Sequence, residues 1–309
     1  MFLNFNAYKS DRKKFLDVWS SVVGGIAATL ALEMIFTIIT LIIAVAITQQ
    51  EQPTIPMCIS LYGTLGGIFG TWWIIRGQKW KGPEVGVLFN KQTLKEYFLG
   101  AGLALIMLVL SIVPAFVAKQ ATFSYANLTS ADWLMWGVYG IGFVIQSFSE
   151  EYLCRGLIMK RLNQRYNIWW SVFIQAAIFM LLHAGNPGMG VIPYVNLLLW
   201  GIIFGQVVLL TDNLMLASGL HWLWNFAQGC IFGIKVSGMD GMTTILNCEM
   251  NGHHMLTGGD FGIEGTISTT IVSVMIIAML SSKMVKVIRA KSTSSEPIEV
   301  IDANPEEGK

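Results

Sequence analysis

Charged residues are scarce in this chain of 309 residues, because lysine, arginine, aspartate and glutamate together make up only 13% of it. A soluble globular domain typically carries about 25%. Neither sign of charge dominates: the formal net charge is +1, so the chain lacks the field that would attract nucleic acid. The 4 cysteines are too few for a disulfide framework. These absences exclude a typical water-soluble globule, a nucleic-acid-binding protein and a disulfide-stapled scaffold.

Hydrophobic residues take the place of the missing charges, at 54% of the chain with a mean hydropathy of +0.58. Apolar runs of about 18 residues or more are candidate transmembrane helices. Such runs occur at residues 18–48, 57–75, 97–118, 133–160, 168–186, 191–210, 214–234 and 266–282. We therefore expect an all-α, polytopic membrane protein with about eight transmembrane helices.

The basic residues predict how these helices are oriented. Lysine and arginine gather on the cytoplasmic side of a membrane. Of the 20 basic residues, all but Lys119 and Lys235 lie before the first run, after the second, at the end of the fourth or after the eighth. Alternating runs place all of those positions on one side, so both termini are predicted to be cytoplasmic. We expect a multi-pass protein of a cell membrane, with the bacterial cytoplasmic membrane as the simplest location.

Polar residues inside the apolar runs are the strongest functional signal, because burying them in lipid costs free energy. Counting from the loops at about 1.5 Å per helical residue places those of the fourth, fifth and seventh runs at similar depths. They are Glu150, Glu151 and Arg155 in the fourth run, His183 in the fifth, and His221 and Asn225 in the seventh. Glu33 lies near the middle of the first run, where it can pair with a cation such as Arg155 or hold a proton.

Helical spacing assigns different partners to the two adjacent glutamates. Glu151 and Arg155 are four residues apart, so they share a helix face and can form a salt bridge. Glu150 points about 100° away from Glu151, toward the predicted positions of the histidines. His221 and Asn225 are also four residues apart and share one face.

This set of side chains can hydrolyse a peptide bond. A carboxylate beside a histidine can hold a water molecule and remove its proton. A second histidine and an asparagine amide are donors suited to the oxyanion of a tetrahedral intermediate. No serine or cysteine lies in a convincing nucleophile position, and we interpret Cys154 as a packing residue.

Zinc is the alternative way to activate the water, although no cofactor is expected. Glu150, His183 and His221 could supply three zinc ligands. However, the sequence has no HExxH motif, and these ligands come from three separate helices. A second possible cluster lies in the loop at 235–265, where we expect solvated side chains rather than a metal site. Its members are Glu249, His253, His254 and Asp260.

Three motifs together resemble a known family. EEYLCR in the fourth run, FMLLH in the fifth and HWLWN in the seventh are similar to motifs of the CPBP family, also called Abi. This family comprises CAAX prenyl endopeptidases and bacteriocin-processing proteases, which are intramembrane glutamic endopeptidases. The resemblance covers about residues 140–230. It implies an eight-helix fold with a cavity open to the cytoplasm, and it leaves Glu33 without an assigned role.

The resemblance also implies roles for individual residues. Glu150 and His183 would activate the water, His221 and Asn225 would form the oxyanion site, and Glu151 with Arg155 would support the first motif. Together with the apolar runs and the polar C-terminal tail, it predicts four segments: N-terminal transmembrane helices and a cytoplasmic loop (1–135), a catalytic core (136–234), an extracytoplasmic loop with the last transmembrane helix (235–291), and a disordered cytoplasmic tail (292–309).

Three functions fit these features to different degrees. The favoured one is an intramembrane endopeptidase acting on a membrane-associated peptide or protein, in CAAX-type or bacteriocin processing. The second is a non-proteolytic membrane partner with the same fold, serving in bacteriocin immunity or as the regulator of a sensor kinase. The third is a transporter with buried proton-relay residues. The complete set of motifs favours the first, and the absence of inverted repeats and broken helices disfavours the third.

Overall fold

The computed structural model describes residues 13–48 and 57–293. Within these residues the chain is mostly helical, which confirms the prediction of an all-α membrane protein. No strand was expected from the sequence, yet β1 (Ala121–Tyr125) pairs with β2 (Leu246–Met250) in an antiparallel ribbon. Most of the predicted tail lies outside the described residues.

Every predicted apolar run corresponds to a helical stretch. The long helices are α2 (Phe15–Thr48), α3 (Met57–Gly77), α4 (Lys91–Val117), α5 (Ser130–Glu151), α7 (Ile168–Leu182), α8 (Val191–Thr211), α9 (Met215–Phe226) and α11 (Ile267–Thr293). Helix α5 continues through the π-helix η2 (Tyr152–Met159) into α6 (Lys160–Asn163), and α9 continues into the π-helix η3 (Ala227–Ile231). The short helices are η1 (Gly82–Val85), α10 (His254–Thr257) and η4 (Ile263–Gly265).

Four of these helices are long and apolar enough to cross a membrane. They contain the segments Phe15–Ala46, Lys91–Val117, Val191–Thr211 and Ile267–Lys286. Large hydrophobic side chains are exposed on their surfaces, as Ile38 and Ile42 of α2 illustrate, which suits contact with lipid rather than water. The count of eight spans and the cytoplasmic position of both termini stay predictions.

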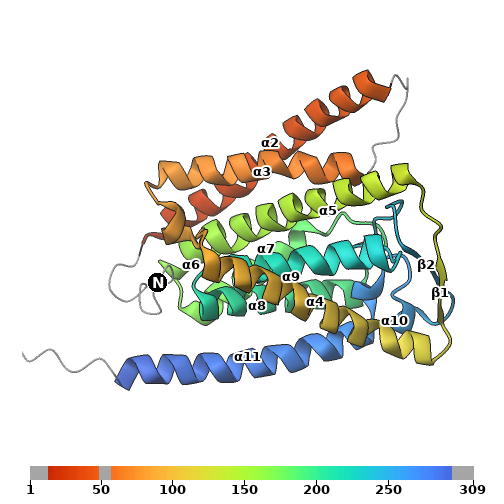
Figure 1. Ribbon diagram of the computed structural model, residues 1–309. Coiled ribbons are helices and arrows are strands. Elements are labelled where there is room, and N and C mark those ends of the chain that lie inside the picture. The colour runs from red at the N-terminus through yellow and green to blue at the C-terminus, as the bar shows by residue number, and fades with distance from the viewer. Residues whose placement is uncertain (1–12, 49–56, 294–309) are drawn as a thin grey trace, which may run out of the picture.

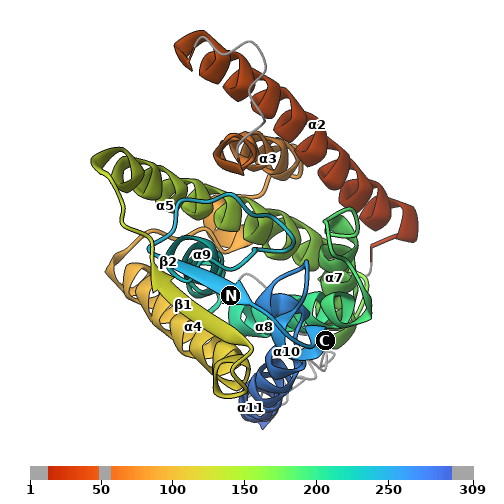
Figure 2. The ribbon, with the colours of Figure 1, turned by 90° about the vertical axis from the view of Figure 1, so that its right-hand side faces the viewer.

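The helices run roughly side by side, with the β1–β2 ribbon and α10 at one end and α6 at the other (Figure 1). Helix α5 packs against both α3 and α9, while α8 packs against α7 and α11. Figure 2 shows α2 and α3 along one edge of the bundle. They approach closely at Gly66 and Gly70, where an added Cβ would meet the backbone of Leu32 and Ala28. Helix α2 also packs against the π-helix η2, which continues α5.

The turn between α6 and α7 brings two predicted site residues to the same level. Asn167 caps the N-terminus of α7, where its side chain accepts a hydrogen bond from the backbone N–H of Trp170 at 3.0 Å. It ends beside His183, and α5 runs antiparallel to it toward the same turn. Because the chain reverses here, Glu150 and His183 lie at similar distances from the turn on neighbouring helices.

The π-helix η2 forms part of the centre of the bundle. All eight of its residues are buried, and Leu157, Ile158 and Met159 are fully inaccessible to solvent. A π-helix inside an α-helix widens the turn and is frequent at functional sites. Here it directly follows the pair Glu150 and Glu151.

Candidate active site

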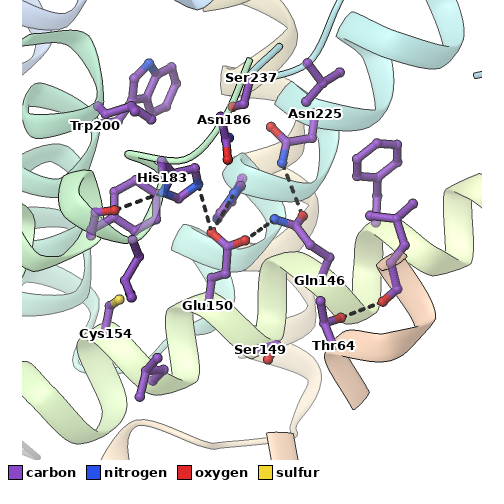
Figure 3. A pocket seen from close by; sticks show the side chains of 18 of the residues that line it. Thr64, Gln146, Ser149, Glu150, Cys154, His183, Asn186, Trp200, Asn225 and Ser237 are labelled. Carbon is purple, nitrogen blue, oxygen red and sulfur yellow. Dashed lines mark hydrogen bonds and ion pairs between the residues drawn. The ribbon is translucent and has the colours of Figure 1, made fainter. Parts of the chain in front are cut away.

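Four of the predicted site residues line one cavity of about 250 Å³, while Glu151 and Arg155 lie outside its lining (Figure 3). Its walls come from helices α2, α3, α5, α7, α8 and α9 and from the segment that leads to α11. Glu150, His183, His221 and Asn225 all line it. Segments that are distant in the sequence therefore meet here.

Glu150 lies between the two histidines. Its Oε2 atom is 3.8 Å from His183 Nε2 and 3.8 Å from His221 Nε2. These separations exceed the usual 2.7–3.2 Å of a direct hydrogen bond to nitrogen, so a small molecule such as water can bridge the groups. Glu150 is also the least buried of the three side chains, at 25% exposure against 15% for His183 and 7% for His221.

Both imidazole rings are oriented through Nδ1. His183 Nδ1 lies 2.9 Å from the carbonyl oxygen of Phe179, one turn earlier in α7. His221 Nδ1 lies 3.0 Å from Glu151 Oε1. A carbonyl oxygen or a carboxylate can only accept, so each Nδ1 carries a proton. The Nε2 atom of each ring therefore faces Glu150.

Glu151 has two partners, of which the sequence predicted one. Arg155 Nη1 donates to Glu151 Oε1 at 3.1 Å, and both side chains are fully buried. The same oxygen accepts the hydrogen bond from His221. Arg155 also donates to the carbonyl oxygen of Gly201 at 3.3 Å and lies 4.7 Å from the ring of Phe179. Glu151 thus neutralises Arg155 and also orients a proposed catalytic histidine.

Gln146 is a site residue that the sequence analysis missed. Its Nε2 donates to Glu150 Oε1, and its Oε1 accepts from Asn225 Nδ2 at 3.2 Å. It therefore connects the proposed base to the proposed oxyanion donor (Figure 3). The available signal was its spacing, because Gln146 precedes Glu150 by one helical turn and so shares its face.

Glu33 of α2 also lines the cavity. Glu33 lies beside Ser149. Both side chains are close to Gly67, where an added Cβ would meet each of them. The pairing of Glu33 with Arg155 considered from the sequence is wrong, since Arg155 is occupied by Glu151 and Gly201.

The loop residues considered as a second metal cluster have other contacts. Lys235 Nζ forms a 2.9 Å ion pair with Asp260, which raises the pKa of Lys235 and lowers that of Asp260. The rings of His253 and His254 stack on each other at 4.5 Å. Over residues 13–48 and 57–293, no group of three or more His, Cys, Asp or Glu side chains is arranged to hold a metal ion.

Residues 131–227 match the family model described as Type II CAAX prenyl endopeptidase Rce1-like. This segment of the helical core is therefore similar to the CAAX prenyl endopeptidases. The resemblance drawn from the three motifs is thereby confirmed, and every proposed catalytic residue of this endopeptidase-like core lies inside the matched segment. No curated protein sequence matches the chain.

Proposed function

We propose that the protein is an intramembrane endopeptidase that hydrolyses a peptide bond of a membrane-associated peptide or protein. The observation that carries this proposal is the position of Glu150 Oε2, at 3.8 Å from the Nε2 atoms of both His183 and His221. The family match supports the same reaction class, because the family is one of proteases. The direct test is cleavage of peptides by purified protein, compared between the wild type and a Glu150 variant.

In the proposed mechanism Glu150 is the general base. A water molecule held between Glu150 Oε2 and His183 Nε2 gives one proton to Glu150 while its oxygen attacks the carbonyl carbon of the peptide bond. Protonated Glu150 then donates this proton to the departing amine nitrogen as the C–N bond breaks. The hydrogen bond from Gln146 to the other oxygen of Glu150 keeps the carboxylate in position.

The oxyanion of the tetrahedral intermediate is stabilised by His221 and Asn225 in this mechanism. His221 can donate from Nε2 only when both ring nitrogens carry protons, because its Nδ1 proton is engaged by Glu151. The adjacent carboxylate of Glu151 compensates the positive charge of that imidazolium. Asn225 supplies the second donor from the next turn of the same helix, with its amide oriented by Gln146.

Replacing Asn225 by alanine is expected to lower kcat by roughly 10²-fold, by analogy with other oxyanion donors. The KM should barely change, because the amide acts mainly on the transition state. Steady-state kinetics of the purified variant would measure both values. The control is Asn247→Ala, which removes an exposed amide on β2. A large rise in KM with an unchanged kcat would contradict the oxyanion role.

Activity is expected to survive thorough removal of divalent metal ions, because the proposed mechanism uses only side chains to activate the water. The measurement is peptide cleavage before and after treatment of purified protein with a strong chelator. Loss of activity that stoichiometric zinc restores would favour the zinc alternative, with Glu150, His183 and His221 as ligands.

The proposed topology has eight spans and both termini in the cytoplasm. Reporter fusions should therefore place the N-terminus and the loop at residues 77–96 in the cytoplasm, and the loop at 235–265 outside it. The loop at 77–96 contains Lys79, Lys81, Lys91 and Lys95, which supports a cytoplasmic position. An external reporter signal from either cytoplasmic position would contradict the arrangement.

A further inference from the structure

A segment outside the recognised motifs forms part of the cavity wall. Ser237 and Met239, between α9 and β2, line it together with Glu264 of η4. Figure 3 shows Ser237 on the same side as Asn186 and Asn225, facing the space above Glu150. The family match ends at residue 227, so this wall lies outside the matched segment.

Glu264 fixes the wall through its carboxylate. Its Oε2 atom accepts hydrogen bonds from the backbone N–H of Ser237 at 2.6 Å and from the Ser237 hydroxyl at 2.8 Å. Its Oε1 atom accepts from Trp224 Nε1 at 3.1 Å. Glu264 is only 5% exposed, and burial raises the pKa of its carboxyl although these hydrogen bonds oppose the rise.

The same carboxylate is connected to the helix that carries the proposed oxyanion donors. Trp224 immediately precedes Asn225 in α9, and its indole ring packs against Trp200 of α8 with 4.4 Å between ring centroids. Asn196 of α8 donates to the backbone carbonyls of Glu264 and Thr266, the latter at 2.9 Å. Glu264 is thus held by α8 while it joins the wall to α9.

We propose that the segment 237–239 is a peptide-binding wall of the cavity and that Glu264 is its positioning residue, an inference that rests on the proposed endopeptidase function. The Ser237 hydroxyl donates a hydrogen bond to Glu264. Its oxygen lone pairs can therefore accept a hydrogen bond from an N–H group of a bound peptide. Met239 adds an unbranched apolar side chain, which adapts to side chains of different shapes. The wall therefore takes an extended peptide segment beside the scissile bond.

The test compares Ser237→Ala and Glu264→Gln with the matched control Ser268→Ala. Ser268 also loses buried hydrogen bonds on substitution, at 2.8 Å to the carbonyl oxygen of Ser111 and at 2.9 Å to the Thr266 hydroxyl, but it does not line the cavity. The probe is a farnesylated peptide with a fluorophore and a quencher on either side of the scissile bond. Rates give kcat and KM, and binding to each variant in a Glu150→Gln background gives Kd without turnover.

We expect about a tenfold increase in KM and Kd for Ser237→Ala and Glu264→Gln, with kcat changed far less and with the control unchanged. Unaltered KM and Kd in Ser237→Ala would overturn the inference even if Glu264→Gln fails to fold. Equal losses in all three variants would also overturn it, since they would indicate a purely structural role. If Glu150→Gln abolishes cleavage while the wall variants behave as wild type, only this inference fails. A probe that the wild type neither binds nor cleaves would count against both.

Discussion

Replacing Glu150 by glutamine is expected to reduce peptide cleavage by about 10²–10⁴-fold, the usual contribution of a positioned general base. Glutamine keeps the size of the side chain and can still interact with Gln146, but it cannot take a proton from water. The amount of protein in the membrane and its unfolding temperature should change little, because Glu150 is partly exposed to the cavity and carries no structural ion pair with a lysine or arginine among the described residues. The measurement is the cleavage rate of purified protein at matched concentration.

The matched control for this variant is Glu249→Gln, which makes the same substitution at an exposed position on β2. It should leave cleavage unchanged. A cellular assay extends the test, because a non-proteolytic membrane partner would keep its function in both Glu150→Gln and Asn225→Ala. A phenotype fully retained by both variants at normal membrane levels would reject proteolysis as the physiological role and favour immunity or kinase regulation.

Replacing Glu151 by glutamine is expected to destabilise the fold by about 3–5 kcal/mol, the usual result of removing one partner from a buried ion pair. Arg155 is fully buried, so its charge would lose its counterion in a medium of low dielectric constant. Arg155 and His221 already share one oxygen of Glu151, so glutamine can keep both hydrogen bonds but not the negative charge. The expected result is a clearly lower unfolding temperature in detergent and reduced accumulation in the membrane.

The double variant Glu151→Gln/Arg155→Met provides the control for this explanation. It removes the unpaired charge, so it should be more stable than Glu151→Gln alone. Both variants should cleave poorly, since His221 loses the carboxylate that orients it. The division of roles between the two glutamates would be wrong if Glu150→Gln and Glu151→Gln lowered stability equally.

The local sequence determined the helices and most of the site. Apolar runs of membrane-spanning length fixed where the helices lie, because such a segment must satisfy its backbone hydrogen bonds internally. The spacing of Glu151 and Arg155 fixed their salt bridge, since residues four apart share a helix face. Counting residues from the turn at Asn167 placed Glu150 and His183 at one depth, because the rise per residue of a helix is constant.

Only the tertiary structure decided contacts between segments that are distant in the sequence. It showed that Glu151 is shared between Arg155 and His221, and that Gln146 joins Glu150 to Asn225. It also brought Glu264 to Trp224 and Ser237, and it paired β1 with β2. Helical periodicity determines which residues share a face of one helix. The partner that each face meets depends on how all the helices pack, which no single run of sequence specifies.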